Sequence, residues 1–300
     1  MTRHMEKSTI LQKLSSLKIG PLTTDESRFH LVVMGESGAG KTSFVGSLSP
    51  NGPLCPALFI DLEGGTSSVA TPEGIPGVAY VAPSNYEQLL ALSEVLGWDD
   101  SDPQKPEDLK NLRTLIIDSL TSMSVNTVAD VSASPLAPEK SKTPFRSAQS
   151  DYLIAQNMIM HILRQAKNAG LNIVATASID KRETSMGGMN LPRGLKDQMQ
   201  LLMSYIWQME TLTQDDTVYH ILFTQQAYKG DGIKTRNTNV RKALLDKSAQ
   251  LYKLLGRTGS GRFQGSFILA DPLDEQKPAG QVTLEDLYNV WKEALDIKGP

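Results

Sequence analysis

The 300-residue sequence lacks several features that mark other classes of protein. Cys55 is its only cysteine, which excludes an intramolecular disulfide framework and favours a reducing, cytoplasmic location. The N-terminus has no apolar core of a secretory signal, and no apolar run approaches the roughly 18 residues of a membrane span. The 4 histidines are far apart in the sequence and have no metal-ligand spacing. We therefore expect neither membrane contact nor a histidine-based metal site.

The chain also lacks an excess of charge of one sign. Its formal net charge is −3, so any contact with nucleic acid must come from local basic patches. Hydrophobic residues make up 40% of the chain and charged residues 21%, values typical of a globular protein with a sizeable core. This length suits one large α/β domain with additional segments, or two small domains.

One glycine-rich stretch carries the clearest chemical signal. Gly35 to Thr42 matches G-x-x-x-x-G-K-[ST], the phosphate-binding loop of nucleoside triphosphatases. The apolar run 29–34 before it has the length of a strand, and residues 43–48 can begin a helix. Backbone N–H groups at such a helix start bind phosphate, Lys41 supplies a cation for the β- and γ-phosphates, and Thr42 can coordinate Mg²⁺. The residues expected to bind nucleotide are Gly35, Glu36, Ser37, Gly38, Ala39, Gly40, Lys41, Thr42 and Ser43.

Two further predicted strands lead into carboxylates. The strand 57–61 is followed by Glu63 and two glycines, and the run 112–117 ends at Asp118. The carboxyl ends of parallel strands line the ligand crevice of an α/β sheet. We therefore expect Asp118 to hold Mg²⁺ opposite Thr42, and a carboxylate after the earlier strand to activate water. The alternative is that Asp61 and Glu63 only cap the turn.

Two irregular stretches, 132–147 and 180–195, are rich in basic side chains and follow strands expected in the middle of the sheet. They could grip a polyanion from one edge of the sheet, or they could be solvated loops. The residues concerned are Lys140, Lys142, Arg146, Lys181, Arg182 and Arg193.

We expect three parts in the chain. Residues 1–27 form a short helical segment that folds back on its own domain or docks on a neighbouring subunit. Residues 28–242 form the nucleotide-binding core. Residues 243–300 form a helical extension, whose last helix is capped at Thr283 with Asp286 three residues on.

With these motifs in order, residues 28–242 resemble the RecA-like ATPases, and most of all the phage-encoded branch related to RecA and RadA that includes single-strand-annealing proteins. The resemblance implies a RecA-like P-loop core, α/β in class, with a mostly parallel central sheet and helices on both faces. In this family the strand pattern F-I-D-x-E supplies the general base, and residues 59–63 match it, so the role falls on Glu63. The magnesium aspartate falls on Asp118. A basic pair that reaches the neighbour's γ-phosphate falls on Lys234 and Arg236.

The resemblance further implies an Mg²⁺-dependent ATPase that binds ATP between protomers and acts on single-stranded DNA in homologous recombination, by annealing or strand exchange. The two DNA-binding loops would lie at about 131–147 and 180–195. The expected partners are single-stranded DNA, further copies of the chain in a ring or filament, and a single-strand-binding protein. The location would be the bacterial host cytoplasm if the chain is phage-encoded.

One position departs from the family. The γ-phosphate sensor before the second loop is usually Gln or His, and the matching residue here is Ser178, which is too short to bridge the phosphate and the loop directly. Two other functions stay open: a DNA helicase or motor on the same core, and a non-hydrolysing ATP-binding switch that locks an assembly.

Overall fold

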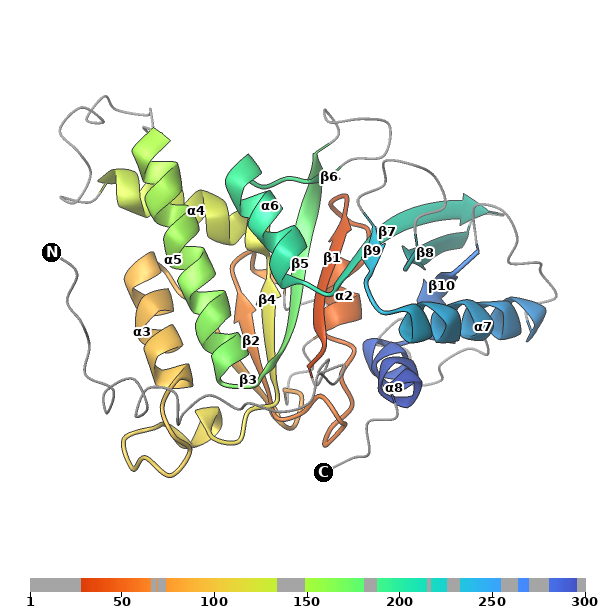
Figure 1. The fold of residues 1–300 in the computed structure, drawn as a ribbon, viewed down its shortest axis with the longest axis horizontal. Coiled ribbons are helices and arrows are strands. Elements are labelled where there is room, and N and C mark those ends of the chain that lie inside the picture. Colours follow the sequence, from red (N-terminus) through yellow and green to blue (C-terminus); the bar gives the residue numbers. More distant parts are fainter. Residues whose placement is uncertain are drawn as a thin grey trace, which may run out of the picture.

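A computed structural model of the protein describes residues 28–65, 69, 74–133, 149–180, 188–214, 217–225, 233–254, 264–269 and 281–295. In these residues one central sheet is covered by helices on both faces (Figure 1). Within the same ranges, no helix combines the length and the apolar character needed to cross a membrane. The expected N-terminal segment, residues 1–27, lies outside the described residues.

The main strands of the sheet follow the apolar runs of the sequence. They are β1 (His30–Gly35), β2 (Ala57–Asp61), β3 (Val78–Val81), β4 (Thr114–Asp118), β5 (Asn172–Asp180), β7 (Tyr205–Gln214), β8 (Thr217–Phe223), β10 (Ser266–Leu269) and β11 (Gln281–Val282). Their order across the sheet is β11-β10-β8-β7-β1-β5-β4-β2-β3. The strands from β7 to β3 pair in parallel, whereas β8 pairs antiparallel with both β7 and β10. Two short strands, β6 (Gly188–Met189) and β9 (Lys234–Thr235), pair with β5 and β7.

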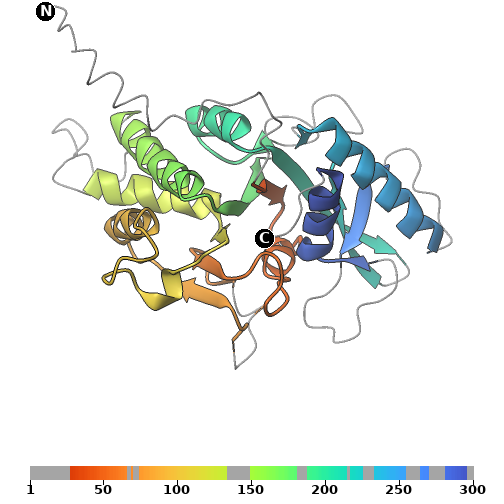
Figure 2. The same cartoon turned by 60° about the horizontal axis from the view of Figure 1, so that its bottom comes forward.

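Helices cover the sheet in two groups (Figures 1 and 2). Each group packs on one set of strand side chains. One face carries α3 (Tyr86–Leu96), α4 (Leu120–Ala133), α5 (Gln149–Asn168) and α6 (Arg193–Leu202), and the other carries α2 (Lys41–Val45), α7 (Thr238–Leu254) and α8 (Leu284–Ala294). A short 3₁₀ helix, Glu107–Leu109, precedes β4. Successive β1 residues alternate between the two cores, with Val32 and Met34 in the first and Leu31 and Val33 in the second. Burial on both faces explains why the central strands are continuous apolar runs.

The parallel register aligns the ends of the strands that carry the sequence motifs. Gly35 at the end of β1 lies beside Ser178 of β5 and Met209 of β7. Asp61 at the end of β2 lies beside Asp118 at the end of β4. The carboxyl ends of these strands therefore share one edge of the sheet. The expected α/β class, with a mostly parallel central sheet and helices on both faces, is confirmed.

Element boundaries differ from the sequence expectations in two places. The first basic stretch was expected to begin near residue 131, but α4 continues to Ala133. The second, expected at 180–195, contains β6, and Arg193 is already the first residue of α6. In both cases a helix or a short strand includes residues whose composition alone predicts a loop.

The C-terminal residues continue the same sheet and core. The boundary expected at residue 242 falls inside α7, and β10 and β11 extend the sheet beyond it. The expected cap of the last helix is confirmed, because Thr283 and Asp286 form a reciprocal capping box at the start of α8. Trp291 of α8 donates its Nε1–H to the Tyr205 hydroxyl at 2.9 Å, inside an aromatic cluster with Phe29 at the start of β1.

Candidate nucleotide-binding site

The glycine-rich loop leaves β1 and enters α2 at the carboxyl edge of the sheet. Gly38 and Gly40 have positive φ angles of 77° and 86°, a region in which residues with a Cβ are strained. Gly40 is the N-cap residue of α2, and its side chain-free backbone leaves the start of the helix open. Residues 36–38 are exposed, whereas Ala39 and Lys41 are buried. The exposed part of the loop therefore lies at the start of a helix, the position at which backbone N–H groups bind phosphate.

Lys41 lies across the base of this loop. Its Nζ donates hydrogen bonds to the carbonyl oxygens of Gly35 at 3.1 Å and Glu36 at 2.8 Å. Burial lowers the pKa of Lys41, while the nearby carboxylates of Glu63 and Asp118 act to raise it. A buried ammonium group held by two carbonyl dipoles is stabilised when an anion enters the loop. The position of Lys41 fits the binding of a polyphosphate.

A histidine on β8 contacts the phosphate loop. His220 of β8 donates its Nδ1–H to the carbonyl oxygen of Ala39 at 2.9 Å, although the two residues are 181 positions apart. The ring lies so close to Gly40 that a Cβ there would be 3.0 Å from Nδ1. The sequence did not predict this contact. His220 is an isolated histidine, and nothing in the sequence indicates that its strand lies next to the phosphate loop.

The predicted magnesium ligands lie together beside the loop. Thr42 donates its hydroxyl to Asp118 Oδ2 at 2.7 Å, and the Thr176 hydroxyl of β5 donates to Asp118 Oδ1. Asp118 is 1% exposed, and burial raises the pKa of its carboxyl, against the lowering effect of the Thr176 and Thr42 hydrogen bonds. A buried carboxylate next to a hydroxyl is an oxygen-donor pair that a divalent cation stabilises.

These groups fit Mg²⁺ and not a fully protein-caged metal. The described residues contain no cluster of three or more His, Cys, Asp or Glu side chains that could enclose an ion. Mg²⁺ commonly uses one or two protein oxygens together with water and substrate phosphates, which matches Thr42 and Asp118 at the open edge of the loop.

The turn that carries Glu63 is organised by Asp61. The Asp61 Oδ1 atom accepts the backbone N–H groups of Glu63 at 3.0 Å, Gly64 at 2.7 Å and Gly65 at 3.3 Å. Gly64 has a φ angle of 72°, so the turn requires a residue without a Cβ penalty there. Gly65 lies close to the predicted magnesium ligands: a Cβ on it would be 3.2 Å from the Thr42 hydroxyl oxygen. Asp61 is thus the residue that caps this turn, and Glu63 projects from it.

The Glu63 carboxylate is held by Ser119, which directly precedes α4, and by Ser122 in the first turn of that helix. Its Oε1 atom accepts the hydroxyl hydrogens of Ser119 and of Ser122, the latter at 2.8 Å. The carboxylate is also close enough to Lys41 to act on the pKa of that lysine. The structure therefore brings Glu63, Lys41 and Asp118 to one corner of the sheet edge.

Ser178 lies beside Gly35 in the register of β5 and β1. Its backbone N–H donates to the Thr121 hydroxyl of α4 at 2.9 Å. Strand β5 continues past Ser178 to Asp180, so the residue is within the strand and not at its tip. Its register places it beside the residue at which the phosphate loop begins, and its role as a sensor stays a prediction.

The basic pair Lys234 and Arg236 contacts the end of α6 in the same chain. Lys234 Nζ donates to the carbonyl oxygens of Gln200 and, at 3.3 Å, Met203, and Arg236 donates to that of Leu201 at 3.1 Å. Burial, with a smaller effect of Arg236, lowers the pKa of Lys234. Cations at a helix C-terminus are stabilised by its unpaired carbonyls and by the helix dipole. In a single chain the pair therefore binds the C-terminus of α6 and makes no described contact with the phosphate loop.

Of the six basic residues expected to bind DNA, only Arg193 belongs to the described part of the chain. It is the first residue of α6, and its side chain is exposed. Lys140, Lys142, Arg146, Lys181 and Arg182 lie outside the described residues. The described strand β5 ends on the side of the sheet that carries the phosphate loop, and the second basic stretch begins there.

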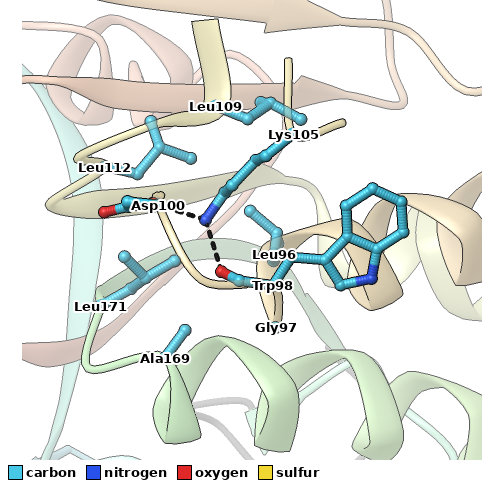
Figure 3. Close-up of a pocket in the computed structure, with 9 residues that line it drawn as sticks. All are labelled: Leu96, Gly97, Trp98, Asp100, Lys105, Leu109, Leu112, Ala169 and Leu171. Atoms are coloured by element: carbon cyan, nitrogen blue, oxygen red, sulfur yellow. Dashed lines mark hydrogen bonds and ion pairs between the residues drawn. The ribbon is translucent and has the colours of Figure 1, made fainter. Parts of the chain in front are cut away.

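A pocket at the opposite edge of the sheet has a different character (Figure 3). It lies near the starts of β4 and β5 and is lined by leucines, Trp98 and Lys105. Lys105 Nζ points toward the Trp98 carbonyl oxygen at 2.9 Å and the Asp100 carboxylate at 2.6 Å. Both contacts tie the loop between α3 and β4 together, so this lysine stabilises the loop and the chemical site is at the other edge.

Comparison with known proteins assigns the chain to a family. The sequence profile of a family described as AAA domain matches residues 27–242. A search of curated proteins finds no match. Among solved structures, the chain is similar to the KaiC-like protein PH0186 from the hyperthermophilic archaeon Pyrococcus horikoshii OT3, with a TM-score of 0.37 and 13% identity over 65% of this chain and 78% of that one.

Proposed function

The chain belongs to the AAA domain family and is a P-loop ATPase, and from this premise we propose that it is an Mg²⁺-dependent ATPase that assembles with further copies of itself and acts on single-stranded DNA. The observation that carries the ATPase assignment is the convergence of Lys41, Thr42, Asp118 and Glu63 at the carboxyl edge of the sheet. The DNA-directed output, strand annealing or exchange, rests on the resemblance to RecA-like proteins and on the basic stretches of the sequence. The single thiol fits a cytoplasmic location.

Substrate binding uses the loop and its lysine. The N–H groups of residues 36–42 hold the phosphates, and Lys41 leaves the Gly35 and Glu36 carbonyls to contact the β- and γ-phosphates. Thr42 and Asp118 would hold Mg²⁺, which would supply positive charge to neutralise the charge that develops on the phosphates. Because Asp118 and Lys41 are both buried, their charges act in a medium where electrostatic interactions are strong.

Glu63 is the proposed general base. Its carboxylate acts electrostatically on Lys41 of the phosphate loop, and we propose that it accepts a hydrogen bond from the attacking water and orients it toward the γ-phosphate. The Asp61-capped turn limits the freedom of the Glu63 backbone, which favours one orientation of its side chain. Ser178 lies beside Gly35 and would contact the nucleotide from the neighbouring strand.

Lys234 and Arg236 are proposed to act on the nucleotide of an adjacent protomer. In the single chain both bind the C-terminus of α6, so assembly must exchange those carbonyl contacts for the neighbour's γ-phosphate. A phosphate is the better partner for a cation than helix carbonyls. A cation supplied by a neighbour increases turnover by about 10³–10⁵-fold. We therefore expect slow turnover in dilute, unassembled protein and faster turnover as the concentration rises.

The ATPase assignment is tested by two substitutions with matched controls. Lys41→Ala should abolish nucleotide binding, measured by fluorescence of a labelled nucleotide, whereas Lys110→Ala, at a lysine paired with the exposed Glu107 away from the loop, should bind normally. Glu63→Gln should bind ATP normally and lose phosphate release, whereas Glu107→Gln at the surface should hydrolyse as the wild type does. Normal hydrolysis by Glu63→Gln would show that another residue is the base.

The DNA assignment is tested by adding single-stranded DNA to the wild-type protein. Binding of the DNA, a change in ATP turnover and annealing of complementary strands are expected. Processive strand displacement would favour a helicase or motor instead. ATP binding without phosphate release would favour an assembly switch, and DNA that neither binds nor alters turnover would contradict the DNA-directed function.

A further inference from the structure

The first turn of α4 holds the proposed base, the magnesium aspartate and the sensor strand together. Ser119 directly follows Asp118, and Ser119 and Ser122 both donate their hydroxyls to Glu63 Oε1. Between them, Thr121 accepts the Ser178 N–H at 2.9 Å. One helical turn therefore contacts Glu63 from β2 and Ser178 from β5.

The two serines are themselves ordered by the helix start. Ser119 is completely buried, and its Oγ accepts the Ser122 backbone N–H at 3.2 Å while its hydroxyl hydrogen points to Glu63. The Ser119 carbonyl accepts the Met123 N–H at 2.9 Å, the first bond of the helix. The hydroxyl positions are thus set by backbone geometry and not by free side-chain rotation.

The far part of α4 is anchored on its neighbours. Asp130 accepts the Tyr86 N–H at the start of α3 at 2.8 Å, and Ser132 donates to the buried carboxylate of Asp151 in α5 at 3.1 Å. The helix therefore cannot rotate without breaking contacts to two other helices, and its first turn is a fixed support for Glu63.

We infer that Ser122, together with Ser119, is a positioning residue for the general base, acting through Glu63. Both hydroxyls occupy Oε1, and no described residue donates to Oε2, so Oε2 is the oxygen that accepts the hydrogen bond of the attacking water. The same turn is tied to β5, because the Thr121 hydroxyl accepts the Ser178 N–H. This inference rests on the proposed role of Glu63 as the base.

The test uses the full-length protein and the variant Ser122→Ala. Loss of one hydroxyl–carboxylate hydrogen bond should lower kcat about tenfold while KM for ATP and the affinity for ADP stay unchanged. Ser122→Thr keeps the hydroxyl and should restore most of the rate. Ser101→Ala is the matched control, because Ser101 also donates to a carboxylate, that of Asp99 at 2.6 Å, but on an exposed loop outside the site. It should leave kcat unchanged.

The Glu63→Gln background separates positioning from a general structural effect. If Ser122 acts through Glu63, adding Ser122→Ala to Glu63→Gln should not lower the residual rate, measured over long incubation, any further. A further tenfold loss there would overturn the inference, as would a wild-type kcat in Ser122→Ala while Glu63→Gln is inactive. Full activity of Glu63→Gln would instead contradict the proposed function, so the two failures are distinguishable.

Discussion

Replacing Asp61 with alanine should damage catalysis far more than nucleotide binding. Asp61 is 3% exposed, and its Oδ1 atom accepts three consecutive backbone N–H groups, at 3.0, 2.7 and 3.3 Å, from the turn that carries Glu63. Alanine at this position leaves the turn without its acceptor. The Glu63 backbone can then move relative to the phosphate loop, whereas Lys41 and Thr42 keep their contacts.

The size of the effect follows from these hydrogen bonds. A hydrogen bond to a charged group contributes about 1.5–3 kcal/mol, so the two shorter bonds represent about 3–6 kcal/mol. Glu63 and Gly64 are exposed, and water will solvate their freed N–H groups, so we expect a net loss of about 2 kcal/mol in the free energy of unfolding. Displacement of a catalytic group by about 1 Å can reduce the rate about 10²-fold, and we expect kcat to fall by that order.

Two assays on the same preparations test this reasoning. Urea unfolding gives the stability, and phosphate release with saturating ATP gives kcat, with nucleotide affinity measured separately. Asp61→Asn is the control, because its amide oxygen still accepts the three N–H groups without the charge, and it should lose about 1 kcal/mol and less than tenfold in kcat. An Asp61→Ala protein with wild-type turnover and stability would refute the view that this turn positions the base.

Three further predictions concern residues that support the loop or the core. His220→Ala removes the hydrogen bond to the Ala39 carbonyl and should weaken nucleotide binding by about five- to tenfold with little effect on kcat. The control His161→Ala, on the surface beside Glu94, should bind nucleotide normally. Equal nucleotide affinities of the two variants would contradict the view that His220 supports the phosphate loop. Burial, with the nearby charges of Lys167 and Arg28, lowers the pKa of His30 from 6.5 to about 4. The unfolded chain therefore binds a proton at this ring at a higher pH than the folded protein does. The free energy of unfolding is unaffected by His30 above pH 6.5 and declines, by up to about 3 kcal/mol, as the pH falls toward 4. His30→Leu should flatten that decline in urea unfolding measured at pH 7 and 4.5, and an unchanged slope would contradict the assignment. Trp291→Ala should cost about 3–5 kcal/mol in unfolding free energy and Trp291→Phe less, because the indole is 1% exposed and bonds to Tyr205; a loss below about 1 kcal/mol would show that α8 does not stabilise the core.

Local patterns were sufficient where the chemistry is carried by adjacent residues. The phosphate loop requires glycines at positions of positive φ followed by lysine and threonine, and all of these are consecutive in the sequence. The same holds for the capping box at Thr283 and for the strands that end at Asp61 and Asp118, whose continuous apolar runs are typical of parallel strands buried on both faces. The order of these elements along the chain also predicted the RecA-like class.

Long-range hydrogen bonds could not be predicted in the same way. The support of Ala39 by His220 joins a loop to an antiparallel strand 181 residues away, and the position of that strand depends on the complete sheet order. The binding of Lys234 and Arg236 to the C-terminus of α6 depends on the position of that helix. The sequence predicts an irregular loop through residue 195, whereas α6 begins at Arg193. Composition alone does not reveal such boundaries.

The sequence by itself predicted a phosphate-binding loop, a carboxylate turn and an aspartate, each following a strand of an α/β core, because each depends on residue types at fixed local spacing. The tertiary structure decided how these parts are held. Parallel register aligned Asp61 with Asp118, α4 brought Ser119 and Ser122 to Glu63, and β8 brought His220 under the loop. These contacts join residues from distant parts of the chain, so they exist only after the sheet has assembled and buried both of its faces.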